Sequence, residues 1–171
     1  MTALVFVDTN ILLYAVDTRD RLKHDSARDW MTQLWRTRSG RTSVQVLNEF
    51  FVNATRRLEP GLTAEQAWQQ IVALRSWAPQ PMDTQTLELG FNLHTRYKLS
   101  WWDSLIVAAA NLQGCSLLLT EDLQPQAVYA GVTVCSPFAS RVQDVQARYA
   151  PTVDIPQPRR RGRPRTRPAA G

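Results

Sequence analysis

The sequence of 171 residues has only two cysteines, two histidines and no long apolar run. Cys115 and Cys135 lie far apart, outside any CxxC or Cys/His cluster, which disfavours a zinc site and a disulfide scaffold. We expect both to be small core residues. The longest apolar segments, such as residues 106–110 and 117–119, fall far short of the roughly 20 residues of a membrane span. The sequence therefore predicts no transmembrane helix.

The N-terminal segment also lacks the basic region that opens a secretory signal peptide. Residues 1–7 carry no lysine or arginine, and the polar residues Asp8 and Asn10 follow at once. We therefore expect a cytoplasmic protein.

Acidic residues are absent from the C-terminal end of the chain, where the positive charge is concentrated. The formal net charge is +5, but residues 156–171 hold six of the 20 basic residues and none of the 15 acidic ones. The other 155 residues are thus nearly neutral, and five of the ten prolines lie at or after Pro151. We predict a single folded domain at residues 1–150, followed by a disordered Pro/Arg-rich basic tail at residues 151–171.

Short apolar runs alternate with helical patterns along the predicted domain. Residues 3–7, 116–119 and 132–134 are typical of buried strands, and helical periodicity covers about residues 24–36, 63–77, 84–97 and 103–112. Gly40 is expected to end the first of these helices. Thr42 and Gln45 fit a capping box that opens another helix, which carries Glu49 on a polar stripe with Gln45, Asn53 and Arg56. This alternation predicts an α/β fold, a three-layer α/β/α sandwich with a mostly parallel central sheet.

Three aspartates are placed to meet at one edge of this predicted sheet. Asp8 follows the first strand, Asp122 follows the second, and Asp103 opens the buried helix between them. Ligands of open parallel sheets bind beyond the carboxyl ends of the strands, so we expect these acids and Glu49 to share a cleft. Each also has a simpler interpretation: a helix N-cap for Asp8 and Asp103, a solvated position for Glu49, and a turn for Asp122.

Converging carboxylates repel one another unless a cation neutralises them. A set of oxygen ligands without histidine or cysteine selects Mg²⁺ or Mn²⁺. Such an ion activates water and stabilises negative charge on a phosphoryl oxygen, and hydrolysis of a phosphodiester is the reaction that suits it.

Four blocks carry a resemblance to a known family: residues 7–12 (VDTNIL), 46–50 (VLNEF), 100–106 (SWWDSLI) and 119–123 (LTEDL). In order and spacing they resemble the PIN-domain nucleases, above all the VapC toxins of type II toxin–antitoxin systems, over about residues 3–137. The resemblance implies a Mg²⁺- or Mn²⁺-dependent endoribonuclease that cleaves structured RNA, commonly transfer RNA. It also implies a homodimer that is held inactive by a cognate antitoxin protein.

The resemblance further implies which residues form the site. Asp8, Glu49, Asp103 and Asp122 match the acidic quartet that is catalytic and holds the metal. Asn10 matches the polar residue that orients these carboxylates, and Thr120 matches the hydroxyl beside the last acid. The Asn at position 10 also argues against an aspartyl-phosphate phosphatase, which needs a second Asp there.

Other residues have both a functional and a structural interpretation. His94 is expected to be a packing residue rather than a general base. One of Trp101 and Trp102 is expected in the core, although either could stack on bases. Arg56 could contact an RNA phosphate or pair with a carboxylate.

The basic tail contains Arg161, Gly162, Arg163 and Pro164, the core of an AT-hook, a motif that places Arg-Gly-Arg in the minor groove of A·T-rich DNA. A solvated arm that contacts any DNA or RNA through its charge is the simpler interpretation. The alternative function is therefore a catalytically silent PIN-fold module, anchored to nucleic acid by this tail.

Overall fold

A five-stranded sheet lies at the centre of the structure, a computed structural model that describes residues 2–139 and residue 145. The strands are β1 (Val5–Val7), β2 (Gly40–Arg41), β3 (Leu117–Leu119), β4 (Val128–Tyr129) and β5 (Val132–Cys135). Their order in the sheet is β2-β1-β3-β5-β4, and all neighbours are parallel except β4, which pairs antiparallel with β5. Because β1 and β3 are adjacent and in parallel register from Val5 to Val7, their carboxyl ends lie together.

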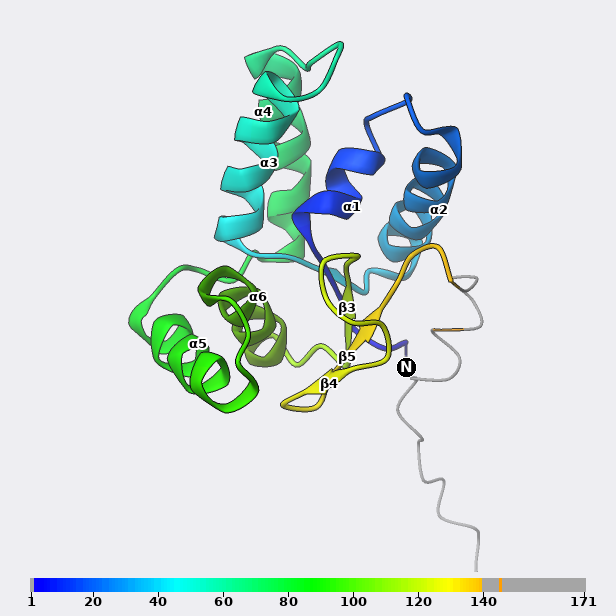
Figure 1. Cartoon of the computed structure of the whole chain (residues 1–171). Helices are drawn as coiled ribbons and strands as arrows, with labels where there is room; N and C mark the ends of the chain where they lie inside the picture. The colour runs from blue at the N-terminus through cyan, green and yellow to red at the C-terminus, as the bar shows by residue number, and fades with distance from the viewer. Residues whose placement is uncertain (1, 140–144, 146–171) are drawn as a thin grey trace, which may run out of the picture.

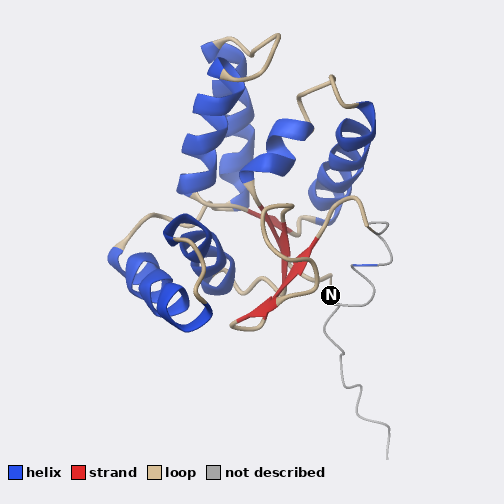
Figure 2. Cartoon of the chain, in the orientation of Figure 1, coloured by secondary structure: helices blue, strands red, loops and turns tan. Residues whose placement is uncertain are grey.

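The helices form two groups with the sheet between them, as Figures 1 and 2 show. One group holds α1 (Thr9–Tyr14), α2 (Arg21–Thr37), α3 (Val44–Arg56) and α4 (Ala64–Leu74), which continues into the short 3-10 helix η1 (Arg75–Trp77). The other is the pair α5 (Thr84–Tyr97) and α6 (Trp101–Leu112), of which α6 packs on β3 and β5. The predicted three-layer α/β/α sandwich with a mostly parallel sheet is confirmed.

The core is built from the strands and from the helix faces turned toward them. All residues of β1 and β3 are buried, as are the large side chains of Trp30 on α2 and Phe50 on α3. Helix α6 is buried continuously from Ser104 to Ala110, as its apolar composition predicted. Cys115 and Cys135 are buried and unpaired, which confirms that they are core residues. Within the described residues, no helix combines the length and apolarity needed to span a membrane.

Several helix boundaries differ from the predicted ones. Helix α2 ends at Thr37, three residues before Gly40, because Arg38 adopts the left-handed conformation and closes the helix. Gly40 instead lies in β2, where an added Cβ would come within 2.5 Å of the Trp77 ring. The prediction that Gly40 stops the helix was wrong, since this glycine is needed for close packing.

The N-termini of two helices were also placed wrongly. Ser43, not Thr42, caps α3 by accepting a hydrogen bond from the Val46 backbone N–H, while the Thr42 hydroxyl donates to the carbonyl of Val7. Ser100 caps α6, so Asp103 lies in the first turn and is not the N-cap. The predicted domain boundary at residue 150 and the basic tail lie outside the described residues.

Candidate active site at the carboxyl edge of the sheet

Asp8 lies at the junction of β1 and α1, where strand pairing determines its position. Its backbone N–H donates to the Leu119 carbonyl at 3.1 Å, which joins the ends of β1 and β3. One carboxylate oxygen accepts from the Thr9 N–H at 2.7 Å and the other from the Thr120 hydroxyl at 2.8 Å. Asp8 is therefore the N-cap of α1 and also a buried carboxylate at the edge of the sheet.

Asn10 and Thr120 link Asp8 to Asp122. The Asn10 side-chain amide donates to the Thr120 hydroxyl at 3.2 Å and to the Asp122 carboxylate at 3.0 Å. The fully buried Thr120 hydroxyl also accepts the Asp122 backbone N–H at 3.1 Å. A single hydroxyl thus holds the Asp8 carboxylate and the turn that carries Asp122.

Glu49 reaches the same edge from α3. One of its carboxylate oxygens accepts from the Thr9 hydroxyl at 2.9 Å, and the other accepts from the Gln45 side-chain amide at 3.0 Å. Gln45 also contacts α6 through the Trp102 carbonyl at 3.5 Å. Glu49 is consequently half-buried and oriented from two sides rather than freely solvated.

Asp103 joins this edge from the first turn of α6. Its carboxylate accepts from the Ser100 hydroxyl at 2.6 Å, and it raises the pKa of Asp122 by charge repulsion. The Ser100 hydroxyl therefore orients the Asp103 carboxylate in the first turn of α6, the helix that packs on β3 and β5.

Burial and mutual repulsion disturb the titration of these acids. Burial, with smaller contributions from the charges of Asp122 and Glu49, raises the pKa of Asp8 to about 6 despite the hydrogen bonds from Thr120 and Thr9. The pKa of Asp122 is also raised, first by burial and then by the nearby charges of Asp103, Glu121 and Glu49. The four predicted acids are thus close enough to repel one another, and a bound cation would relieve this repulsion.

The donor set at this edge suits a hard cation. It consists of carboxylate, hydroxyl and amide oxygens, and the buried amide oxygens of Asn10 and Gln45 have no hydrogen-bond donor. Among residues 2–139 and 145, however, no three His, Cys, Asp or Glu side chains gather closely enough to form a ready-made metal site. The chemistry of the residues fits Mg²⁺ or Mn²⁺, and holding such an ion would require the carboxylates to approach one another.

A cavity of about 400 Å³ opens beside these carboxylates. Its lining includes Glu49, Asp122 and Asn10 from the acidic edge, and also Asn53, Arg57 and Arg19. Arg56, which shares the predicted polar stripe with Glu49, is exposed and does not line the cavity. The residue that shares the cavity with Glu49 and Asn53 is therefore Arg57. Positions 49, 53 and 57 are four residues apart, the spacing of residues on one helix face.

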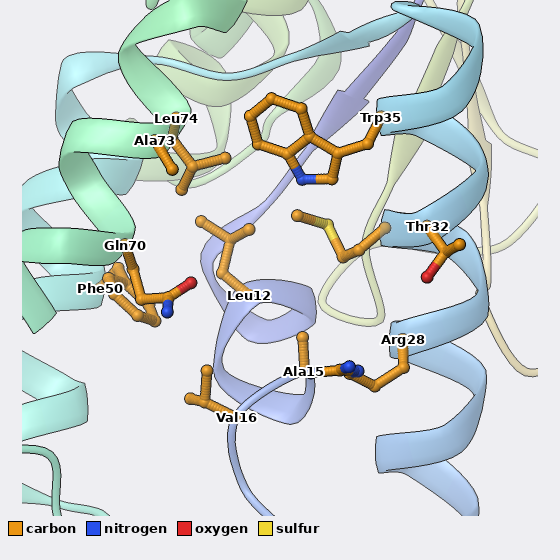
Figure 3. A pocket seen from close by; sticks show the side chains of 11 residues that line it. Leu12, Ala15, Val16, Arg28, Thr32, Trp35, Phe50, Gln70, Ala73 and Leu74 are labelled. Carbon is orange, nitrogen blue, oxygen red and sulfur yellow. The ribbon is translucent and has the colours of Figure 1, made fainter. Parts of the chain in front are cut away.

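A second cavity, of about 300 Å³, lies among α1, α2, α3 and α4. Figure 3 shows Trp35 from α2 and Leu12 from α1 pointing into it. Eight of its eleven lining residues are apolar, with Arg28, Thr32 and Gln70 as the polar members, and it contains no carboxylate. This surface is distinct from the acidic edge.

The remaining candidates have structural positions. His94 Nδ1 lies 2.7 Å from the carbonyl oxygen of Leu99, and its ring meets the edge of Trp101. The residue is nevertheless exposed on α5, so the prediction of a packing residue is not confirmed. The prediction that one of the two tryptophans is core was wrong, because Trp101 is 36% and Trp102 62% exposed.

An ion-pair cluster that the sequence did not reveal supports the loop that carries Asp122. Lys23 on α2 pairs with Glu121 at 2.9 Å and donates to the Tyr14 hydroxyl at 3.0 Å, and Tyr14 itself donates to Glu121. The ammonium of Lys23 also lies over the rings of Tyr14 and Phe138. The cluster joins four distant segments, so no local pattern could have identified it.

Comparison with known sequences establishes the family. The family model of the PIN domain matches residues 5–131, which contain all four acids. The chain belongs to the PIN domain family. No curated protein matches it in a sequence search.

Solved structures share the PIN fold at low sequence identity. A toxin–antitoxin complex from Klebsiella pneumoniae has a TM-score of 0.57 and 23% identity, and the match covers 78% of this chain and 97% of that one. VapC20 of Mycobacterium tuberculosis, a toxin that cleaves the sarcin–ricin loop, has a TM-score of 0.55 and 21% identity over 75% and 98% of the two chains. VapBC2 of Rickettsia felis, bound to a fragment of its promoter DNA, has a TM-score of 0.55 and 16% identity over 78% and 98%.

Proposed function

We propose that this PIN-domain protein is a metal-dependent endoribonuclease, the toxin of a toxin–antitoxin pair, which hydrolyses phosphodiester bonds in structured RNA such as transfer RNA. The observation that carries the proposal is the buried Asp8 carboxylate, whose pKa is raised to about 6 at an edge shared with Glu49, Asp103 and Asp122. Burying a carboxylate near other acids lowers the stability of the fold, and carboxylates with perturbed pKa values in a cleft are typical of active sites. Because the proposed substrate is cellular RNA, we place the activity in the cytoplasm.

In the proposed mechanism, Asp8, Asp103 and Asp122 would hold Mg²⁺ or Mn²⁺, and Glu49 would contribute directly or through water. The ion would activate a water molecule for attack on the phosphodiester and stabilise negative charge on the phosphoryl oxygen. Thr120 and Asn10 orient Asp8 and Asp122, and Gln45 and Thr9 orient Glu49. No side chain of the protein needs to form a covalent intermediate.

The test compares RNA cleavage by the full-length wild type, Asp8→Asn and Asp103→Asn with Mg²⁺, with Mn²⁺ and with a chelator. We expect metal-dependent cleavage by the wild type and a loss of at least about 100-fold in each variant, since even residues that only support a metal ligand contribute about 10- to 100-fold. Asp29→Asn, an exposed carboxylate on α2, is the matched control and should cleave normally. Mapping of RNA 5′ ends after induced expression should show new ends with the wild type and none with Asp8→Asn.

Two outcomes would contradict this function. Full metal-dependent cleavage by Asp8→Asn would show that the acids are misassigned. RNA binding by the wild type without cleavage in either metal would favour the catalytically silent nucleic-acid-binding module.

We further propose that a cognate antitoxin occupies the apolar cavity among α1, α2, α3 and α4 with an apolar segment of its chain. Two of the structural neighbours are toxin–antitoxin assemblies, and the cavity is open, largely apolar and separate from the acidic edge. We expect the antitoxin to be encoded by a short reading frame just upstream of the gene.

A charge placed in this cavity should weaken the complex. Ala73→Glu puts a carboxylate among apolar lining residues, whereas Val72→Glu places the same charge on an exposed neighbouring position of α4 outside the cavity. Co-expression with the upstream protein, followed by co-purification and RNA cleavage assays, should show lost binding and relieved inhibition for Ala73→Glu only. Equal inhibition of both variants would exclude this surface.

A further inference from the structure

The cavity beside the acidic edge contains basic residues as well as carboxylates. Its volume of about 400 Å³ is lined by the carboxylates of Asp17, Glu49 and Asp122 and also by Asn53, Arg57 and Arg19. Glu49, Asn53 and Arg57 follow one another at four-residue spacing along α3 and its C-cap, so one helix face contributes an acid, an amide and a cation to the lining.

The two arginines of this cavity differ in their partners. The Arg19 guanidinium is held by both carboxylate oxygens of Asp17, at distances of 2.8 to 3.2 Å, so its charge is already neutralised. Among the described residues, the Arg57 guanidinium has no hydrogen bond or ion pair, although its backbone N–H closes α3 on the Asn53 carbonyl. Arg57 is thus the unneutralised cation of a cavity that otherwise presents carboxylates.

We propose that Arg57 binds a backbone phosphate of the RNA substrate, on a nucleotide that flanks the one cleaved at the acidic edge. This inference rests on the proposed nuclease function and adds a substrate-positioning residue to it. Arginine binds phosphate through paired N–H donors, and in this place it would offset the repulsion between the RNA and the carboxylates.

The length of α3 places Arg57 nearer to a flanking phosphate than to the scissile one. Eight residues separate it from Glu49, which corresponds to about 12 Å along the helix at 1.5 Å per residue. Bases play no part in this contact, so we expect it to strengthen binding of all RNA sequences alike.

The experiment uses the full chain with Arg57→Ala, Arg57→Lys and, as the matched control, Arg56→Ala, the adjacent exposed arginine outside the cavity. Cleavage of unfractionated transfer RNA with Mg²⁺ gives KM and kcat, and anisotropy of a fluorescein-labelled, mixed-sequence 8-nucleotide RNA gives the dependence of affinity on salt. For Arg57→Ala we expect KM to rise about tenfold with kcat within about twofold. The slope of log affinity against log salt should fall by about 0.7, the value for one phosphate contact to a single strand.

The controls separate a phosphate contact from a structural role. Arg57 also lies at the C-terminus of α3, where a positive charge stabilises the helix, so loss of stability alone is not informative. Arg57→Lys retains the charge and should restore the salt slope, while Arg56→Ala should match the wild type. The proposal is overturned if Arg57→Ala and Arg56→Ala agree in both KM and salt slope. If the wild type cleaves no RNA, the nuclease function fails, and the anisotropy measurements still decide the Arg57 contact.

Discussion

Asp8 combines two roles that conflict while no cation is bound. As N-cap of α1 it accepts the Thr9 N–H, and as part of the acidic edge it is buried beside the charges of Asp122 and Glu49. The hydrogen bonds from Thr9 and Thr120 favour the charged carboxylate, but burial outweighs them and raises the pKa to about 6. Asp8 is therefore expected to destabilise the metal-free fold at neutral pH.

The sign of this effect can be tested by unfolding in the presence of a chelator. Between pH 4 and 6 the folded protein holds a proton on Asp8 that the unfolded chain has released, so the free energy of unfolding should fall as pH rises through this window. The expected loss is about 3 kcal/mol and should be complete above about pH 6. Asp8→Asn should remove most of this dependence, leaving the part that arises from the raised pKa of Asp122, and it should be more stable than the wild type at pH 7, whereas Asp29→Asn should follow the wild type. A wild-type stability that rises over this window would contradict the assignment.

At the scale of elements, the start of α3 determines where Glu49 lies. Thr42 and Ser43 both have side chains that could cap a helix, and sequence spacing favours Thr42 with Gln45. In the structure Thr42 directly follows β2 and its hydroxyl reaches back to the carbonyl of Val7 in β1, so the helix begins one residue later. This tertiary contact with β1 thus selected the cap.

Two substitutions should separate these roles. Ser43→Ala removes the cap hydrogen bond to the Val46 N–H and should lower the free energy of unfolding by about 1 kcal/mol. Thr42→Val keeps the shape of a fully buried side chain and loses only a long hydrogen bond of 3.4 Å, so it should cost less. Urea unfolding of both variants measures the difference, and a larger loss for Thr42→Val would show that Thr42 is the effective cap.

At the scale of the whole molecule, the charge distribution separates a basic C-terminal segment from the nearly neutral rest of the chain. The net charge of +5 arises from residues 156–171, whereas the nearly neutral remainder places four of its 15 acidic residues, Asp8, Glu49, Asp103 and Asp122, around one edge of the sheet. The tail segment Arg161–Gly162–Arg163–Pro164 lies outside the described residues, so its role stays a prediction. We expect it to increase affinity for DNA or RNA without taking part in cleavage.

Deletion of residues 156–171 tests this division. The truncated protein should bind nucleic acid more weakly and with a smaller salt slope, because up to six arginines no longer release counterions. Cleavage of a short RNA should remain within about twofold of the full chain at saturating substrate. Anisotropy titrations at several salt concentrations and single-turnover cleavage provide the two measurements. A loss of cleavage on truncation would show that the tail belongs to the active site.

The homodimer predicted from the sequence needs an apolar surface that a second copy can cover. Large apolar side chains are exposed on α5 and at the start of α6, with Phe91 61% and Trp102 62% exposed. We expect a second copy to cover these helices. Light scattering should give twice the monomer mass for the wild type and a monomer for Phe91→Asp. A monomeric wild type at high concentration would contradict the dimer.

The sequence alone determined the fold class, the buried strands and the placement of the acids, with Asp8, Asp103 and Asp122 at the ends of predicted elements and Glu49 on the polar face of a predicted helix. These features depend on local periodicity and on the rule that parallel strands end at one edge, which act through short stretches of chain. The two-residue strands β2 and β4 carried too little pattern to be predicted.

Only the tertiary structure decided which polar side chains share the site. The hydrogen bonds of Thr120 to Asp8 and of Asn10 to Asp122 each join residues 112 positions apart, and the salt bridge of Lys23 to Glu121, the residue before Asp122, spans 98 positions. Arg57 rather than Arg56 lines the cavity because the packing of α3 sets which side of the helix faces it. Local patterns can place a residue on an element, but contacts between distant elements determine its burial, its pKa and its partners.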